Sequence, residues 1–68
     1  MNFNSIQEAF PIGTDVVIKF ELDDPELVDN YTVVGYGISY SRKILVHIVS
    51  PHTNMGTYVI PQCLCRID

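Results

Sequence analysis

Hydrophobic and polar residues alternate along much of the chain, which is the pattern of β-strands with one buried face. The clearest example is residues 15–22, where every second side chain is apolar. Later segments are rich in β-branched and aromatic residues and are bounded by turn residues. The pattern predicts five strands, at residues 15–22, 31–40, 43–49, 57–60 and 65–67.

The connections between these segments are too short for parallel crossovers, which need a dozen or more residues. Neighbouring strands must therefore pair as antiparallel hairpins. The sequence predicts a mainly β fold, built as a small five-stranded antiparallel barrel. Gly35 and Gly37 interrupt the second strand and predict a bulge or a bend there.

Two short helical turns are expected to flank the strands. Ser5 and Glu8 fit the pattern of a capping box near the start of the chain, and Pro11 is expected to end that turn. Its apolar side is made by Ile6, Ala9 and Phe10. Pro61 opens a tight 3-10 turn before the last strand. We expect one domain over residues 1–68, with the helical turn at 1–10 and the barrel at 11–68.

Period-two placement also predicts which side chains form the core and which apolar side chains are left uncovered. The expected core residues are Val16, Ile18, Phe20, Val33, Val34, Ile44, Val46, Ile48, Val59 and Leu64. A single barrel would leave apolar residues on the other faces partly exposed to water. These predict a homodimer interface at Val17, Leu45, Val49 and Ile60.

Composition narrows the class of function. Hydrophobic residues make up 47% of the chain and charged residues 18%, below the usual quarter, which favours a surface partly covered by a partner. The formal net charge is −4, which argues against non-specific nucleic-acid binding. No signal sequence and no membrane-spanning segment are recognised. Cys63 and Cys65 are one residue apart, which favours reduced thiols and a cytoplasmic protein.

The order of the elements resembles the SH3-like small β-barrel superfamily, over residues 10–68. The resemblance is carried by Phe10-Pro-Ile-Gly-Thr-Asp-Val-Val-Ile, Val33-Val-Gly, and Tyr58-Val-Ile-Pro-Gln-Cys-Leu-Cys-Arg-Ile. The resemblance implies a ligand groove walled by the first long loop, whose acids pair with basic residues of the ligand. The chain lacks the tryptophan pair and the Ala-Leu-Tyr-Asp-Tyr motif of members that bind proline-rich peptides.

The connection at residues 23–30 is acidic, and it predicts a binding groove opposite the turn at residues 39–42. The carboxylates would attract Arg or Lys of a protein partner, and a tyrosine face would hold the alkyl stem. The predicted groove residues are Asp23, Asp24, Glu26, Asp29, Tyr40 and Pro61. Two other interpretations of this connection are a loop kept polar for solubility and, with less support from its spacing, a calcium site.

The sequence gives weaker support to a methyl-lysine cage, a metal site or an enzymatic activity. Tyr36 and Tyr58 are expected to pack over glycines of the sheet, although converging tyrosines could also form a cage for methylated lysine. The spacing of Cys63 and Cys65 is too short for the usual zinc knuckle, so no metal or cofactor is expected. A chain of this size holds a groove more readily than a water-excluding pocket, so no enzymatic activity is expected.

The sequence therefore favours a non-enzymatic protein-binding or accessory module with an acidic, tyrosine-bearing groove for a basic or mixed protein surface. One alternative is a homo-oligomeric structural or accessory protein of the kind found in phages or bacteria. Another is an acidic mimic of DNA that inhibits a nucleic-acid enzyme. The sequence identifies neither the partner nor the process.

Overall fold

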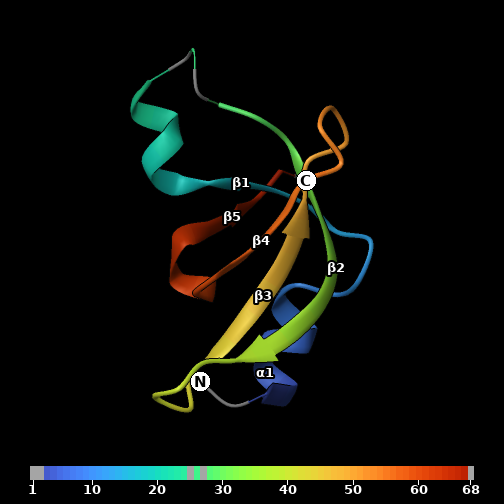
Figure 1. The fold of residues 1–68 in the computed structure, drawn as a ribbon, viewed down its shortest axis with the longest axis vertical. Helices are drawn as coiled ribbons and strands as arrows, with labels where there is room; N and C mark the ends of the chain where they lie inside the picture. The colour runs from blue at the N-terminus through green and yellow to red at the C-terminus, as the bar shows by residue number, and fades with distance from the viewer. Residues whose placement is uncertain (1–2, 25, 27, 68) are drawn as a thin grey trace.

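One five-stranded antiparallel sheet organises the chain (Figure 1). The computed structural model describes residues 3–24, 26 and 28–67. The strands are β1 (Asp15–Ile18), β2 (Tyr31–Ile38), β3 (Ile44–Val49), β4 (Gly56–Val59) and β5 (Leu64–Arg66). The helical elements are the α-helix α1 (Phe3–Ala9) and the 3-10 helices η1 (Lys19–Asp23) and η2 (Pro61–Cys63). None of these described helices is long and apolar enough to cross a bilayer.

The predicted fold class is confirmed: the chain is mainly β, with five antiparallel strands, a short N-terminal helix and a 3-10 turn before the last strand. The strand order is β4-β3-β2-β1-β5, so β1 pairs with both β2 and β5. Within the described residues no ladder joins β4 to β5, and these two strands are the edges of the sheet. The sheet curves as a barrel would, but it stays open between its edges (Figure 1).

The core lies between the inner face of the sheet and α1. Six predicted core residues are buried, and Ile44 and Val59 pack against them half-buried. The helix contributes Ile6 and the residue directly after it is Phe10; these two are 2% and 8% exposed. The buried apolar residues are Ile6, Phe10, Val16, Ile18, Val33, Val46, Ile48 and Leu64. Ile6 belongs to the same buried cluster as the strand residues and Ala9 packs against that cluster, so α1 is part of the core.

The first strand is shorter than predicted, and this excludes Phe20 from the core. The ladder between β1 and β5 ends at the pair Ile18 and Leu64, so residues after Ile18 have no strand to pair with. The chain instead forms η1, whose 3-10 geometry satisfies backbone groups locally. Phe20 is 65% exposed, and its prediction as a core residue is wrong.

Val34 is the second wrong core prediction, and a bulge in β2 explains it. The register between β2 and β3 shifts between Val33 and Gly35, as the glycines of this strand predict. Val33 is fully buried, whereas Val34 at the irregularity is 43% exposed. Adjacent residues of a strand point to opposite faces, so only one of the two valines can enter the core.

Candidate functional site

The acidic end of the molecule, defined as residues 19–24, 26 and 28–30, combines exposed apolar side chains with carboxylates. Phe20 and Leu22 project from η1, with 65% and 51% of their surface exposed. The predicted site residues Asp23, Asp24 and Glu26 are exposed beside them. Apolar side chains that lie close together on the surface and are rimmed by polar residues form a candidate binding surface.

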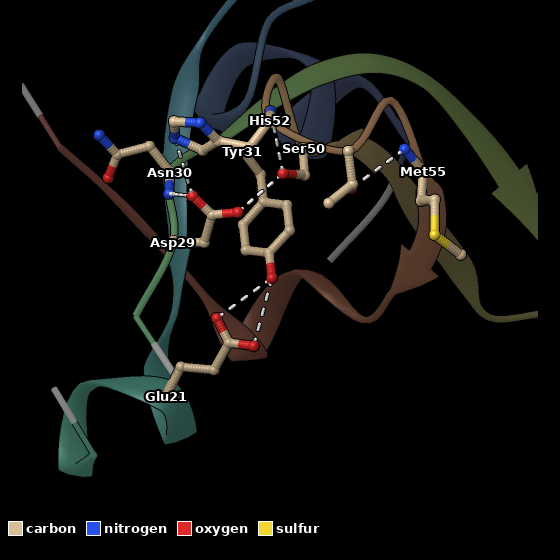
Figure 2. Close-up of polar contacts among 8 residues, drawn as sticks. Glu21, Asp29, Asn30, Tyr31, Ser50, His52 and Met55 are labelled. Atoms are coloured by element: carbon tan, nitrogen blue, oxygen red, sulfur yellow. Dashed lines mark hydrogen bonds and ion pairs between the residues drawn. The ribbon is translucent and has the colours of Figure 1, made fainter. Parts of the chain in front are cut away.

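Two contacts between Tyr31 of β2 and Glu21 of η1 attach the first part of the acidic end to the sheet (Figure 2). The Tyr31 hydroxyl lies 3.2 Å from both carboxylate oxygens of Glu21 and donates its hydrogen bond to them. Burial, followed by the negative charge of Glu21, raises the pKa of Tyr31 above its ordinary value. The protonated hydroxyl is therefore the form that the folded structure stabilises.

Asp29 fastens the other end of the acidic connection to the loop between β3 and β4 (Figure 2). The buried hydroxyl of Ser50 donates to Asp29 Oδ2 at 2.7 Å, and His52 Nε2 lies 3.5 Å from Asp29 Oδ1. The backbone amide of Asn30 donates to the same Oδ1 atom at 2.8 Å. Asp29 thus acts as a clamp between two loops, which the sequence did not predict for this residue.

Ser50, His52 and Asp29 are the residue types of a hydrolytic triad, but their arrangement differs from one. In a triad the imidazole lies between the hydroxyl and the carboxylate, so that it can accept the hydroxyl proton. Here the carboxylate lies between the other two groups, and Ser50 donates directly to Asp29. This geometry holds loops together and does not activate the hydroxyl.

The predicted groove between residues 23–30 and residues 39–42 is not formed. These segments precede and follow β2, so they lie at opposite ends of an eight-residue strand (Figure 1). Tyr40 is fully exposed in the turn between β2 and β3. That turn lies at the lower end of Figure 1, and the acidic end lies at the top. Pro61 is buried in η2. The structure therefore separates Tyr40 and Pro61 from the acidic residues with which they were grouped.

The lower end carries a different concavity, which we call the basic-rimmed groove. It is a surface cavity of about 340 Å³, with apolar lining from Ile6, Ile44, Ile60 and Pro61 and polar lining from Arg42, Lys43 and Gln62. Ile44 also borders a second cavity of about 500 Å³, with Tyr36, Gly37 and Ile38. Ile38 is 75% exposed there. Arg42 and Lys43 are the only adjacent basic residues in the chain.

Three of the four predicted interface residues lie on the outer face of the sheet. Val17, Leu45 and Val49 alternate with buried neighbours and are half-buried on the side away from the core. The fourth, Ile60, is 40% exposed and lines the basic-rimmed groove instead. The structure thus divides the predicted dimer interface between two surfaces.

Stacked rings cover part of this outer face. The His47 and Tyr58 rings stack with centroids 4.3 Å apart. A Cβ atom at Gly37 would lie 2.7 Å from Tyr58 Cε2, so the absence of a side chain lets the tyrosine ring lie close to β2. The prediction that Tyr58 packs over a glycine is confirmed. Tyr36 instead faces the core side and donates from its hydroxyl to the Phe10 carbonyl at 2.6 Å.

The described residues bring together neither a tyrosine cage nor a metal site. Tyr36 and Tyr58 lie on opposite faces of the sheet, since they pair with inward-facing Val46 and outward-facing His47. Cys63 and Cys65 are free thiols. Among the described residues, no group of three or more His, Cys, Asp or Glu side chains is placed to hold a metal ion.

Sequence reasoning missed the Asp29 clamp and the basic-rimmed groove. Ser50 is 21 positions from Asp29, so no local pattern could show that they meet. The groove joins α1, the turn after β2 and η2, and only the fold brings these three segments together. Comparison with protein-family models, with curated proteins and with solved structures finds no match, so the SH3-like resemblance stays a prediction.

Proposed function

We propose that the protein is a non-enzymatic binding module whose acidic end contacts a basic protein surface. The observation that carries this proposal is the exposure of Phe20 and Leu22 on η1, directly beside Asp23 and Asp24. The two apolar side chains would supply contact area that loses water on binding. The carboxylates would select a partner with Lys or Arg and accelerate its approach.

The anchoring contacts support a surface of defined shape. Tyr31 holds Glu21 near the start of the connection, and Ser50 holds Asp29 near its end. Fixed ends reduce the conformational entropy that the segment would lose when it binds. Asp23 and Glu26 make no ion pair within the described residues, so their charges are available to a partner.

A capture experiment with matched variants tests this proposal. The tagged protein is incubated with a lysate, and the captured proteins are compared for wild type, the double variant Phe20→Ser with Leu22→Ser, and Met55→Ser. Met55 is 73% exposed in the loop before β4 and serves as the control for loss of an exposed apolar side chain. We expect a salt-sensitive partner that the double variant loses and the control retains.

The size of the effect distinguishes a true anchor from incidental exposure. Loss of an aromatic anchor weakens the binding free energy by about 1–2 kcal/mol or more, whereas each exposed charge pair contributes about 0.2–1 kcal/mol to it. A captured protein that binds the double variant and wild type equally would place the binding surface elsewhere. Circular dichroism of each variant checks that the fold is retained.

A further inference from the structure

The basic-rimmed groove is the chemical complement of the acidic end. Its accessible apolar lining comes from half-buried Ile44 and exposed Ile60, with Ile6 and Pro61 buried behind them, and its rim carries Arg42 and Lys43. Neither cation makes an ion pair within the described residues. In a chain of net charge −4 with four basic residues in all, this is where the positive charge is concentrated. An occupant should therefore combine apolar side chains with carboxylates.

The backbone of Arg42 provides a second observation about this rim. Arg42 has a φ of +62°, in the left-handed region that favours glycine. It closes the hairpin turn, in which its amide donates to the Ser39 carbonyl at 2.9 Å. Glycine is the residue that such a turn prefers, so an arginine here is less favourable for the fold. A strained position that carries a charge at the edge of a cavity points to a role in binding.

We propose that the occupant of the basic-rimmed groove is the acidic end of a second copy of this chain. This inference rests on the proposed function, because it takes the same acidic surface and names its partner. Phe20 and Leu22 of one copy would contact Ile44 and Ile60 of the other. Asp23 and Asp24 would meet Arg42 and Lys43 across the rim, where such pairs form charge-assisted hydrogen bonds.

The positions of the two surfaces determine the type of assembly. The acidic end and the turn that carries Arg42 lie at opposite ends of the longest dimension, 32 Å (Figure 1). Contact between two different surfaces is head-to-tail, and each pair leaves one acidic end and one groove unused. The protein therefore associates into short chains that lengthen with concentration. A symmetric dimer through the outer face of the sheet would stop at two copies.

Complementary variants test this geometry directly. One double variant, Asp23→Asn with Asp24→Asn, removes charge from the acidic end. The amide oxygen that it places at position 24 can still accept the hydrogen bond that Asp24 receives from the Glu26 amide. The other, Arg42→Gln with Lys43→Gln, removes charge from the groove. Glu8→Gln, on the exposed side of α1, is the control for the loss of one carboxylate. Sedimentation velocity over a concentration series measures the association of each protein.

The wild type and Glu8→Gln should associate at high concentration and dissociate as salt rises, because salt screens exposed charges. Each double variant alone should associate about 2- to 30-fold more weakly, as expected for two exposed pairs. Their equimolar mixture should recover a wild-type contact between the intact groove of one and the intact acidic end of the other. That mixture should stop at a pair, because its remaining surfaces are both neutralised.

Arg42→Gly separates the role of the charge from the stability of the turn. Glycine accepts the positive φ, so this variant should have a higher urea midpoint than wild type. It should nevertheless associate about 1.4- to 5-fold more weakly than wild type, as expected for the loss of one exposed pair. A wild type that stays monomeric at millimolar concentration, double variants that associate normally, or a mixture that recovers nothing would each overturn the head-to-tail proposal. If Phe20 and Leu22 were still needed to capture a partner from lysate, the proposed function would stand while this inference fell.

Discussion

Phe10 and Phe20 provide a matched pair of substitutions, because one ring is in the core and the other is in solvent. Phe10 is 8% exposed and Phe20 is 65% exposed. Truncation of a buried phenylalanine to alanine costs about 3–5 kcal/mol, whereas an exposed substitution usually changes stability by less than about 0.5 kcal/mol. At about 0.05–0.15 kcal/mol per residue, a chain of 68 residues has a free energy of unfolding of roughly 3–10 kcal/mol.

Phe10→Ala should therefore remove from a third to all of the free energy of unfolding, and Phe20→Ala should leave it nearly unchanged. The hydrogen bond from Tyr36 ends on the Phe10 carbonyl, so the alanine variant keeps it and the comparison isolates the ring.

Urea denaturation followed by far-ultraviolet circular dichroism measures both effects, since the chain has no tryptophan to report on unfolding. With an m-value of about 1 kcal/mol/M, each kcal/mol lost lowers the urea midpoint by about 1 M. Equal shifts for the two variants would refute the reasoning. That result would mean that residues 19–23 pack into the core in solution, as a longer first strand would require.

Three further predictions concern the contacts that fasten the acidic end. Tyr31→Phe should lower the free energy of unfolding by about 0.5–1.5 kcal/mol near neutral pH. The pKa of Tyr31 is raised above 10.0, so the wild type holds this stability below pH 10 and loses it as the pH rises through the raised pKa. In thermal melts at pH 7 and pH 11, the difference in stability between wild type and Tyr31→Phe should therefore be smaller at pH 11. Ser50→Ala should lower the free energy of unfolding, measured by urea titration, by about 1.5–3 kcal/mol. The reason is that Asp29 Oδ2 loses the hydroxyl that donates to it at 2.7 Å. His52→Ala should change the same midpoint by less than about 0.5 kcal/mol, since the imidazole is 76% exposed and 3.5 Å from Asp29; a larger loss would show that His52 is part of the clamp.

Alternation predicted the sheet well where a strand has neighbours on both sides. Val46 and Ile48 of β3 are fully buried, as their spacing predicts, because β3 lies between β2 and β4. The same alternation failed at Phe20. Whether a strand continues depends on a partner strand to receive its hydrogen bonds, and the pattern of one segment carries no information about its partner's length.

The candidate site was less predictable than the fold, because it depends on which ends of the strands meet. The carboxylates were correctly placed in an exposed connection, since Asp23, Asp24 and Glu26 are all exposed. Their grouping with Tyr40 failed because both segments flank β2, and a strand holds its two ends apart. Distances across a fold follow from topology, which the residue pattern determines only in part.

The pairing of β1 with β5 has a consequence for the order in which the molecule folds. Val16 pairs with Arg66 and Ile18 with Leu64, so most of the sequence lies between the two strands. The hairpins of β2, β3 and β4 join residues that are close in the chain and need little loop closure. We expect the three-stranded meander to form early and the docking of β5 to come late in folding. During synthesis, β1 must wait for β5 to be made before it gains its second neighbour.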